Sequence, residues 1–534
     1  MARKFIMADY DATLDITIRL GDAIPKNHLA RFIVDVIDRL DLSAVYARYG
    51  SRGAPPYAPE IRLALLFYGY ATGIFSSRKI EQATYQALPF LFLAGNLHPD
   101  HDTIANFRKN FLPEIEELFV QILLRAYAAG VLKLGNISID GPKIHANASK
   151  SHAISYDRLP KIEAQLHQEI EPLIALSTQA EKGIPLPEGL VINEEIVRRQ
   201  ERLENLSEAK VVIEKRAQER FEIEQADYQT VLKERDEKER ILGRKLPGRK
   251  PLPPQEGPRD KDQSNFTDPE SRIMKNSNNN GFEQHYKAQI AVDYNGLLIV
   301  GYSLSNHPND QGEIESTLNP IPAQLGTPVA ASLDNGYFSE SNLKLLESRG
   351  ISPYIATGRL PHLLNLPEVI ASNMEQQNTK QTEVQSNADS FVEETPLLEI
   401  EAIYIGNSSI KTSNRGQAEE VSFTEIQDKL SDIDSTKNQT SEDYSSDNEP
   451  SVKFKMASKL KTEIGQAIYR LRKCTVEPVI GIIKETIGFR QFSLRGLQAT
   501  TGEWNLTCLA FNLKRLHKLT EGEWCSSLIT PTGC

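Results

Sequence analysis

The 534-residue chain has few cysteines, few aromatic residues and no long apolar run. No His or Cys stands at the spacing of zinc ligands and no CxxC pair is present, so the sequence predicts neither a zinc site nor a disulfide framework. The absence of about 18 consecutive apolar residues excludes a transmembrane helix. The N-terminal stretch MARKFIMADYDATLDI lacks the apolar centre of a signal peptide. We therefore expect a cytoplasmic protein whose four cysteines are reduced: Cys474, Cys508, Cys525 and Cys534.

The net charge of −11 would argue against a nucleic-acid partner if it were spread evenly along the chain. It is concentrated in residues 372–452, which contain 17 acidic and 5 basic side chains. Because this segment is also rich in Ser, Asn and Gln and poor in aromatic residues, we expect it to be disordered. Residues 453–534 carry 13 basic and 6 acidic side chains, a balance that allows contacts with phosphates.

Changes of pattern along the chain predict its division into segments. A prior of roughly 150 residues per domain allows three or four domains. The expected segments are an all-helical N-terminal domain (1–130), a first core strand (131–157), a charged helical-hairpin insertion (158–245), a linker (246–279), the central part of the core (280–371), a disordered acidic insertion (372–452), C-terminal core helices (453–520) and a frayed tail (521–534).

The N-terminal 130 residues contain five stretches in which apolar residues recur at helical spacing. Short helices of this kind form helix-turn-helix DNA-binding units or plain helical bundles. With 14 basic and 14 acidic side chains, the charge of this segment favours neither interpretation. If DNA is bound here, the candidates for phosphate contacts are Arg78, Lys79, Arg108 and Lys109.

The charge and apolar pattern of residues 158–245 predicts two charged helices, with a turn at Pro185, Pro187 and Gly189. Opposite charges at neighbouring helical turns suit a solvated surface, and an imperfect apolar seam suits helix pairing. Such a hairpin serves dimerisation, DNA contact or neither. The following Pro-, Gly- and Lys/Arg-rich stretch, 243–262, is expected to be extended and mobile.

Three further patterns indicate strands. Residues 136–140, NISID, alternate and stop at Gly141-Pro142. The runs HYKAQIAV and LLIVGYSLS are joined by DYNG, whose Asn-Gly pair is a strong hairpin signal. VAASLD is a short apolar run that ends in Asp334. Together with the helices, these strands predict an α/β fold.

Three carboxylates occupy informative positions in these patterns. Asp140 and Asp334 each end an apolar run and are followed at once by Gly or Asn-Gly, while Glu477 lies among basic residues in YRLRKCTVEPVIGIIK. Alone, each is an ordinary surface acid. Together, Asp and Glu provide the hard oxygen ligands that a divalent cation needs for phosphoryl transfer. Separations of 194 and 143 residues mean that only tertiary folding brings them together. Near the first acid, His145 is a candidate for phosphate contact or an ordinary structural residue.

The order of these segments, with Tyr469, Arg472 and Lys484 around Glu477, resembles the DDE transposases of bacterial insertion sequences, most closely insertion-sequence family 1182. Further segments are similar to the same family, among them YGYATGIFSSRKIEQA, HPDHDTIANFRKNF, GFEQHYKAQIAVD and NHPNDQGEI. The resemblance covers most of residues 20–150, 265–360 and 455–515.

The resemblance implies an RNase H-like mixed-sheet catalytic core with Asp140 on the first strand, Asp334 at the end of the fourth and Glu477 on a later helix. These three residues would be catalytic and would bind Mg²⁺, with Mn²⁺ able to substitute. Two ions suit the in-line displacement at a phosphodiester. The side chains expected to bind DNA are Lys484, Arg472, Tyr469, Lys143 and Arg495.

The partners implied by the resemblance are double-stranded terminal repeats and target DNA, bound by a homodimer in the bacterial cytoplasm or nucleoid, with no membrane. The reaction would be metal-dependent strand cleavage followed by strand transfer. Two other functions stay open. One is an inactive or domesticated relative that acts as a sequence-specific DNA-binding protein, and the other is a coiled-coil interaction protein. Metal-dependent DNA cleavage distinguishes the transposase from both.

Overall fold

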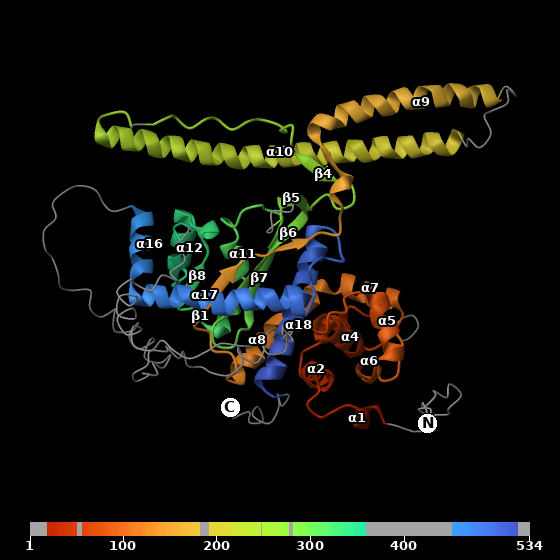
Figure 1. Ribbon diagram of the computed structural model, residues 1–534, viewed down its shortest axis with the longest axis vertical. Coiled ribbons are helices and arrows are strands. Elements are labelled where there is room, and N and C mark those ends of the chain that lie inside the picture. The colour runs from red at the N-terminus through yellow and green to blue at the C-terminus, as the bar shows by residue number, and fades with distance from the viewer. Residues whose placement is uncertain are drawn as a thin grey trace, which may run out of the picture.

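The computed structural model of the chain describes residues 19–50, 56–181, 192–246, 248–276, 281–358 and 451–521. The predicted disorder of 372–452 and fraying of the tail fall almost wholly outside these ranges, as do Cys525 and Cys534. The described residues form one large mixed sheet, helices packed against it and a long helical hairpin (Figure 1). The α/β class is therefore confirmed.

In the described residues, eight helices precede the first strand. Five of them are the predicted helices, and two start with standard signals: Pro59 at the first position of α4, and Asp100, whose side chain accepts the N–H of Thr103 at the start of α7. The three unpredicted helices, α1, α3 and α6, are too short to show helical periodicity. The bounds are α1 (Leu20–Ala23), α2 (Leu29–Ile37), α3 (Ser43–Ala47), α4 (Pro59–Ala71), α5 (Ser77–Gln86), α6 (Leu88–Leu93), α7 (His101–Asn110) and α8 (Leu112–Ala128).

The main sheet follows the order β2–β6–β1–β8–β9, and β5 and β7 also pair with β6. Strand β1 is antiparallel to β6 and parallel to β8, which is parallel to β9. The β6–β7 pair confirms the predicted hairpin. Because β1 and β8 run parallel, their carboxyl ends meet at one edge. The bounds are β1 (Asn136–Asp140), β2 (Lys143–His145), β5 (Arg272–Lys275), β6 (Phe282–Asp293), β7 (Ile299–Ser305), β8 (Ala330–Leu333) and β9 (Ser352–Ile355).

A second, two-stranded sheet, β3 (Ala153–Ser155) with β4 (Gln263–Asn265), flanks the helical insertion. Helices α9 (Leu159–Glu181) and α10 (Ile192–Leu242) lie side by side and extend beyond the main sheet (Figure 1), an arrangement in keeping with the expected helical hairpin. The turn expected at Pro185, Pro187 and Gly189 lies outside the described residues. The stretch after α10 runs back along it and is held there, since Arg220 pairs with Asp262 at 2.9 Å and Arg235 donates to the carbonyl of Leu246 at 3.0 Å.

The last described helices are α16, α17 and α18, with the π-helix η5 between the last two. Thr462 caps α17 through the N–H of Gly465 and so separates it from α16. α18 is buried on all sides over 503–513, because it packs against α4, α8 and β7. The bounds are α11 (Ile314–Leu318), α12 (Glu340–Ser348), α16 (Val452–Lys461), α17 (Glu463–Gly481), the π-helix η5 (Ile482–Thr486) and α18 (Leu497–Leu519), with 3₁₀ turns η1 (Lys150–His152), η2 (Tyr156–Arg158), η3 (Ala323–Leu325) and η4 (Asn335–Tyr337).

Helix α18 joins the N-terminal helices to the sheet in one continuous hydrophobic core. The side-chain amide of Asn512 binds both the N–H and the C=O of Ile299 in β7, each at 2.8 Å. The indole N–H of Trp504 donates to the carbonyl of Gln289 in β6. These side chains satisfy strand and helix polar groups that lie far from water.

A buried polar network links the two ends of the chain through α18. Glu503 is fully buried, accepts the Tyr70 hydroxyl at 2.9 Å and accepts the backbone N–H of Ser493 at 2.9 Å. Arg108 donates to Tyr70 at 2.9 Å and lies 3.8 Å from Glu503. Arg108 is therefore a buried structural residue, and the prediction that it contacts phosphate is wrong.

We expect Glu503→Leu to lower the free energy of unfolding by roughly 3–5 kcal/mol, since it leaves the buried Arg108 charge without its carboxylate. Adding Arg108→Met should recover part of that loss because the uncompensated charge is removed as well. Chemical denaturation of the full chain measures both, with Glu117→Gln on the exposed face of α8 as the control. Equal losses in the single and double variants would show that the buried charge is not the cause.

Candidate active site

The carboxyl edge of the parallel pair β1–β8 brings two of the predicted acids together. Asp140 is the last residue of β1, and Asp334 directly follows β8, whose Leu333 pairs with Ile139. One oxygen of Asp140 accepts the N–H of Gly141 at 2.8 Å, and one oxygen of Asp334 accepts the N–H of the next residue at 2.8 Å. The strand ends thus fix both carboxylates with one oxygen turned toward its own backbone.

Helix α17 crosses β1 and β8 and carries the third acid to the same place. The guanidinium of Arg472 lies among all three carboxylates. Its Nη2 is 2.8 Å from Oδ2 of Asp140 and 3.9 Å from Oδ2 of Asp334, and its Nη1 is 3.2 Å from Oε1 of Glu477. Residues separated by 194 and 143 positions in the sequence therefore converge on one cation.

The electrostatics of this cluster depend on burial and on mutual charge. Burial raises the pKa of Asp140 above its ordinary value, while Arg472 and the N–H of Gly141 act in the opposite direction. For Arg472, burial opposes the charge, but the carboxylates of Asp140 and Asp334 outweigh it and raise its pKa. The Arg472 side chain is 12% exposed, whereas those of Asp334 and Glu477 are 55% and 45% exposed. The cluster therefore has a buried cation and an open acidic rim.

A second polar group, which the sequence analysis did not identify, lies near Asp140 and includes Asp310, whose charge acts on that carboxyl. Asp310 pairs with Lys287 of β6 at 2.5 Å and accepts the amide of Gln289 at 2.9 Å. The hydroxyl of the buried Tyr337 donates to the same Gln289. A Cβ at Gly141 would collide with the Gln289 amide, so a larger residue there would displace that amide from its partners. The sequence held one indication of these residues. Asp310 lies in NHPNDQGEI, a segment similar to the transposase family, and Tyr337 lies three residues after Asp334, in DNGYF.

Lys484 lies on an irregular part of the helix. It follows Glu477 by seven residues but does not lie on the same regular helix, because α17 ends at Gly481 and Lys484 lies in the π-helix η5. Pro478, within the last turn, has no N–H to continue the α-helical ladder. Burial lowers the pKa of Lys484, and the Asp140 carboxylate opposes that effect. π-Turns are frequent at functional sites.

The other residues predicted to bind DNA divide into two groups. Tyr469 is half-buried near the cluster: burial raises its pKa, with Arg472 acting against the rise. Lys143 of β2 lies directly opposite Lys287 of β6 and donates to a nearby carbonyl. Arg495 lies apart from them, exposed, and donates to the carbonyl of Asn147 at 3.2 Å.

The donor set of the cluster fits a hard divalent cation. Asp140, Asp334 and Glu477 offer only carboxylate oxygens, the ligands that Mg²⁺ prefers. Their positive partner in this structure is Arg472, which lies between them. A metal ion would take over that role of counter-charge, and the guanidinium would have to withdraw from the space between the acids.

Two family models match separate parts of the chain. One, described as Transposase domain (DUF772), matches residues 18–110, and the other, described as Transposase DDE domain, matches residues 435–517. The second range includes both Arg472 and Glu477. These matches support a DDE-type transposase. Comparison with curated proteins found no match, and comparison with solved structures found none.

The match to a DDE domain implies an RNase H-like core, and the main sheet can be compared with that expectation. If β2 and β5, which lie between β1 and β6 in the sequence, are left aside, the strands of the main sheet follow the chain as β1, β6, β7, β8 and β9. Asp140 ends the first of these, Asp334 follows the fourth, and Glu477 lies on a later helix. The DDE match also suggests an enzyme that cleaves or transfers DNA strands. None of the helices in the described ranges has the length and apolar character needed to cross a membrane.

Proposed function

We propose that this chain is a DDE transposase of the insertion-sequence family 1182 type, which binds the terminal repeats of its element and catalyses metal-dependent strand cleavage and strand transfer. The observation that carries the proposal is the convergence of Asp140, Asp334 and Glu477 on Arg472. Three carboxylates at such short range repel one another, so the arrangement suits a site that receives positive charge.

In this proposal, Asp140, Asp334 and Glu477 hold two Mg²⁺ ions, for which Mn²⁺ can substitute. When bound, Mg²⁺ activates the attacking oxygen and stabilises the leaving oxygen of the phosphodiester. The fold itself positions the three carboxylates. Asp140 and Asp334 are fixed by adjacent strand ends, and Glu477 by a helix packed across them.

The DNA backbone would lie along the open side of the cluster. Arg472, Tyr469 and Lys484 are in or near the acidic site, and Lys143 lies on the neighbouring strand β2. Arg495, farther along the surface, would contact a more distant phosphate. A homodimer on paired element ends completes the proposal.

Lys484→Gln should weaken DNA binding to a similar degree for specific and non-specific duplexes, because a lysine that contacts phosphate carries no base information. The slope of log affinity against log salt concentration should fall by about 1. Fluorescence anisotropy over a salt series measures both. The control is Lys344→Gln, an exposed lysine on α12. An unchanged salt slope in Lys484→Gln would remove Lys484 from the interface.

The decisive experiment uses duplexes that carry the terminal repeats flanking this gene, with Mg²⁺ or Mn²⁺ and the wild-type chain. The proposal expects nicking at the repeat ends that disappears when the metal is chelated. Specific binding without nicking would favour the non-catalytic DNA-binding relative. Neither binding nor nicking would favour an interaction protein built on the α9–α10 hairpin.

A further inference from the structure

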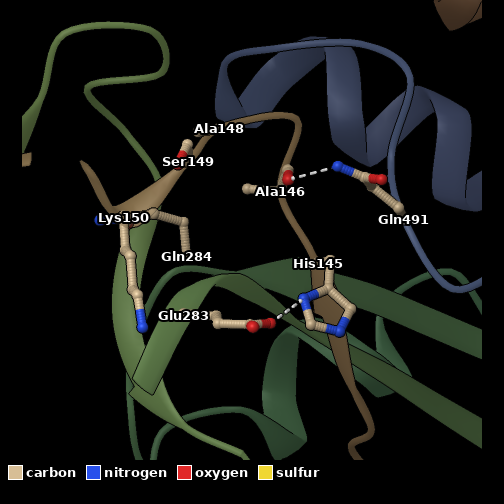
Figure 2. A pocket seen from close by; sticks show the side chains of 8 residues that line it. All are labelled: His145, Ala146, Ala148, Ser149, Lys150, Glu283, Gln284 and Gln491. Carbon is tan, nitrogen blue, oxygen red and sulfur yellow. Dashed lines mark hydrogen bonds and ion pairs between the residues drawn. The ribbon is translucent and has the colours of Figure 1, made fainter. Parts of the chain in front are cut away.

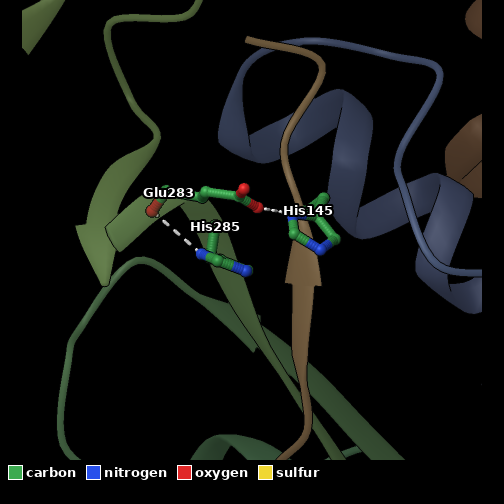
Figure 3. Close-up of side chains that lie close together, drawn as sticks. All are labelled: His145, Glu283 and His285. Atoms are coloured by element: carbon green, nitrogen blue, oxygen red, sulfur yellow. Dashed lines mark hydrogen bonds and ion pairs between the residues drawn. The ribbon is translucent and has the colours of Figure 1, made fainter. Parts of the chain in front are cut away.

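Away from the carboxylate cluster, three side chains with metal-binding atoms gather on the β2–β6 pair (Figure 3). His145 of β2 lies directly opposite His285 of β6, and Glu283 precedes His285 by two residues. Strand side chains alternate between faces, so all three project from the same face of the sheet. Each offers one ligand atom, and the three atoms lie within 4.8 Å of one another.

His285 is held in the form that binds metals. Its Nδ1 lies 2.9 Å from the carbonyl oxygen of Glu283, which only accepts, so Nδ1 carries the proton and Nε2 carries the lone pair. A backbone carbonyl bound to the non-ligating N–H is the usual support for a histidine ligand.

His145 and Glu283 provide the more accessible half of the group. Nδ1 of His145 lies 2.9 Å from Oε2 of Glu283, and the centroids of the two histidine rings are 4.4 Å apart. Their side chains are 42% and 43% exposed, while His285 is buried. Two imidazoles and a carboxylate are thus already close, with His285 fixed and the other two free to adjust.

A cavity of about 410 Å³ opens beside the group. His145 and Glu283 form part of its wall, together with Lys150 and Gln491 (Figure 2). An ion held by the three ligands would therefore keep a position open toward solvent, as metal sites with three protein ligands and a water do.

We propose that His145, His285 and Glu283 form a binding site for one divalent transition-metal ion of the zinc class. Two imidazole nitrogens with one carboxylate oxygen suit Zn²⁺, whereas Mg²⁺ prefers oxygen ligands alone. The site is independent of the proposed function, because it shares no ligand with the carboxylates of Asp140, Asp334 and Glu477.

An ion bound here would link β2 to β6, close to Lys143, which the proposed function assigns to DNA binding. The N–H of His145 donates to the carbonyl of Arg490 at 3.0 Å, and its carbonyl accepts the N–H of Phe492 at 2.9 Å. Lys143 stands two residues before His145. Metal binding would therefore restrain both the strand that carries Lys143 and the loop that follows η5.

The test is a Zn²⁺ titration of the tag-free full chain by calorimetry, with saturating Mg²⁺ present to occupy the carboxylate site. We expect one Zn²⁺ per chain. His145→Ala and Glu283→Gln should each weaken Zn²⁺ binding by about 100-fold or more, since loss of a ligand exceeds the 10–100-fold effect of losing a supporting residue. Co²⁺ provides a second readout, because its visible absorption bands report nitrogen and oxygen coordination and should vanish in the same variants.

Two controls separate this site from other effects. His167→Ala removes an exposed histidine on α9 and should bind Zn²⁺ as the wild type does. Glu477→Gln should also bind Zn²⁺ normally, because it alters the other site. Both altered ligands, His145 and Glu283, are partly exposed, so their variants should fold. The proposal is overturned if the wild type has no one-to-one site, or if the His145→Ala/Glu283→Gln double variant binds Zn²⁺ as tightly as the wild type.

Discussion

Glu477→Gln is expected to reduce the rate of metal-dependent strand cleavage at least about 10³-fold, which corresponds to roughly 4 kcal/mol of activation free energy. Glutamine keeps the size of the side chain but removes the negative charge that would hold the metal. Asp140→Asn and Asp334→Asn should have effects of the same order, since all three carboxylates surround the same position. DNA binding should persist, because these acids would not bind phosphate directly.

Single-turnover cleavage of terminal-repeat DNA measures this prediction, and anisotropy measures binding in parallel. The matched control is Glu485→Gln: Glu485 lies on the adjacent π-helix, is 66% exposed and pairs with Arg490. Because the three acids act as a unit, the triple variant should be little slower than each single variant. Wild-type rates in Glu477→Gln, or a loss as large in Glu485→Gln, would overturn the assignment of Glu477.

Arg472→Gln should destabilise the metal-free protein and increase its response to Mg²⁺. The guanidinium is the shared counter-charge of three carboxylates, so its removal leaves them repelling one another. We expect a loss of about 2 kcal/mol in the free energy of unfolding, below the value for a fully buried pair because Asp334 and Glu477 are half-exposed. Mg²⁺ should restore the lost free energy of unfolding, since the ion can bind the three carboxylates without displacing the guanidinium.

Thermal unfolding with and without saturating Mg²⁺ measures this prediction. The rise in Tm on adding Mg²⁺ should be larger in Arg472→Gln than in the wild type, because ligand stabilisation follows the affinity for the folded state. Arg470→Gln, an exposed arginine on the same helix, is the control and should respond as the wild type does. Equal Mg²⁺ shifts in all three proteins would contradict a counter-charge role for Arg472.

Local properties of the sequence predicted local structure well. The strand that ends at Asp140 was visible because alternation stops at Gly141, and the β6–β7 hairpin because Asn295-Gly296 favours a tight turn. The two helices α9 and α10 followed from helical periodicity in their charged sequences. In each case neighbouring residues determine the backbone. Short helices such as α3 and α6 escaped because they contain too few residues to show a period.

The sequence by itself determined which residues end strands and occupy helices, and therefore which acids were candidates. Only the tertiary structure decided what surrounds them: Arg472 between three carboxylates, and Asp310 near Asp140. It also placed His145 opposite His285 across 140 residues, in a group that ligand spacing along the chain did not predict. The physical reason is that strand register and the packing of α17 across the sheet, and not spacing in the sequence, set the distances between side chains from remote segments.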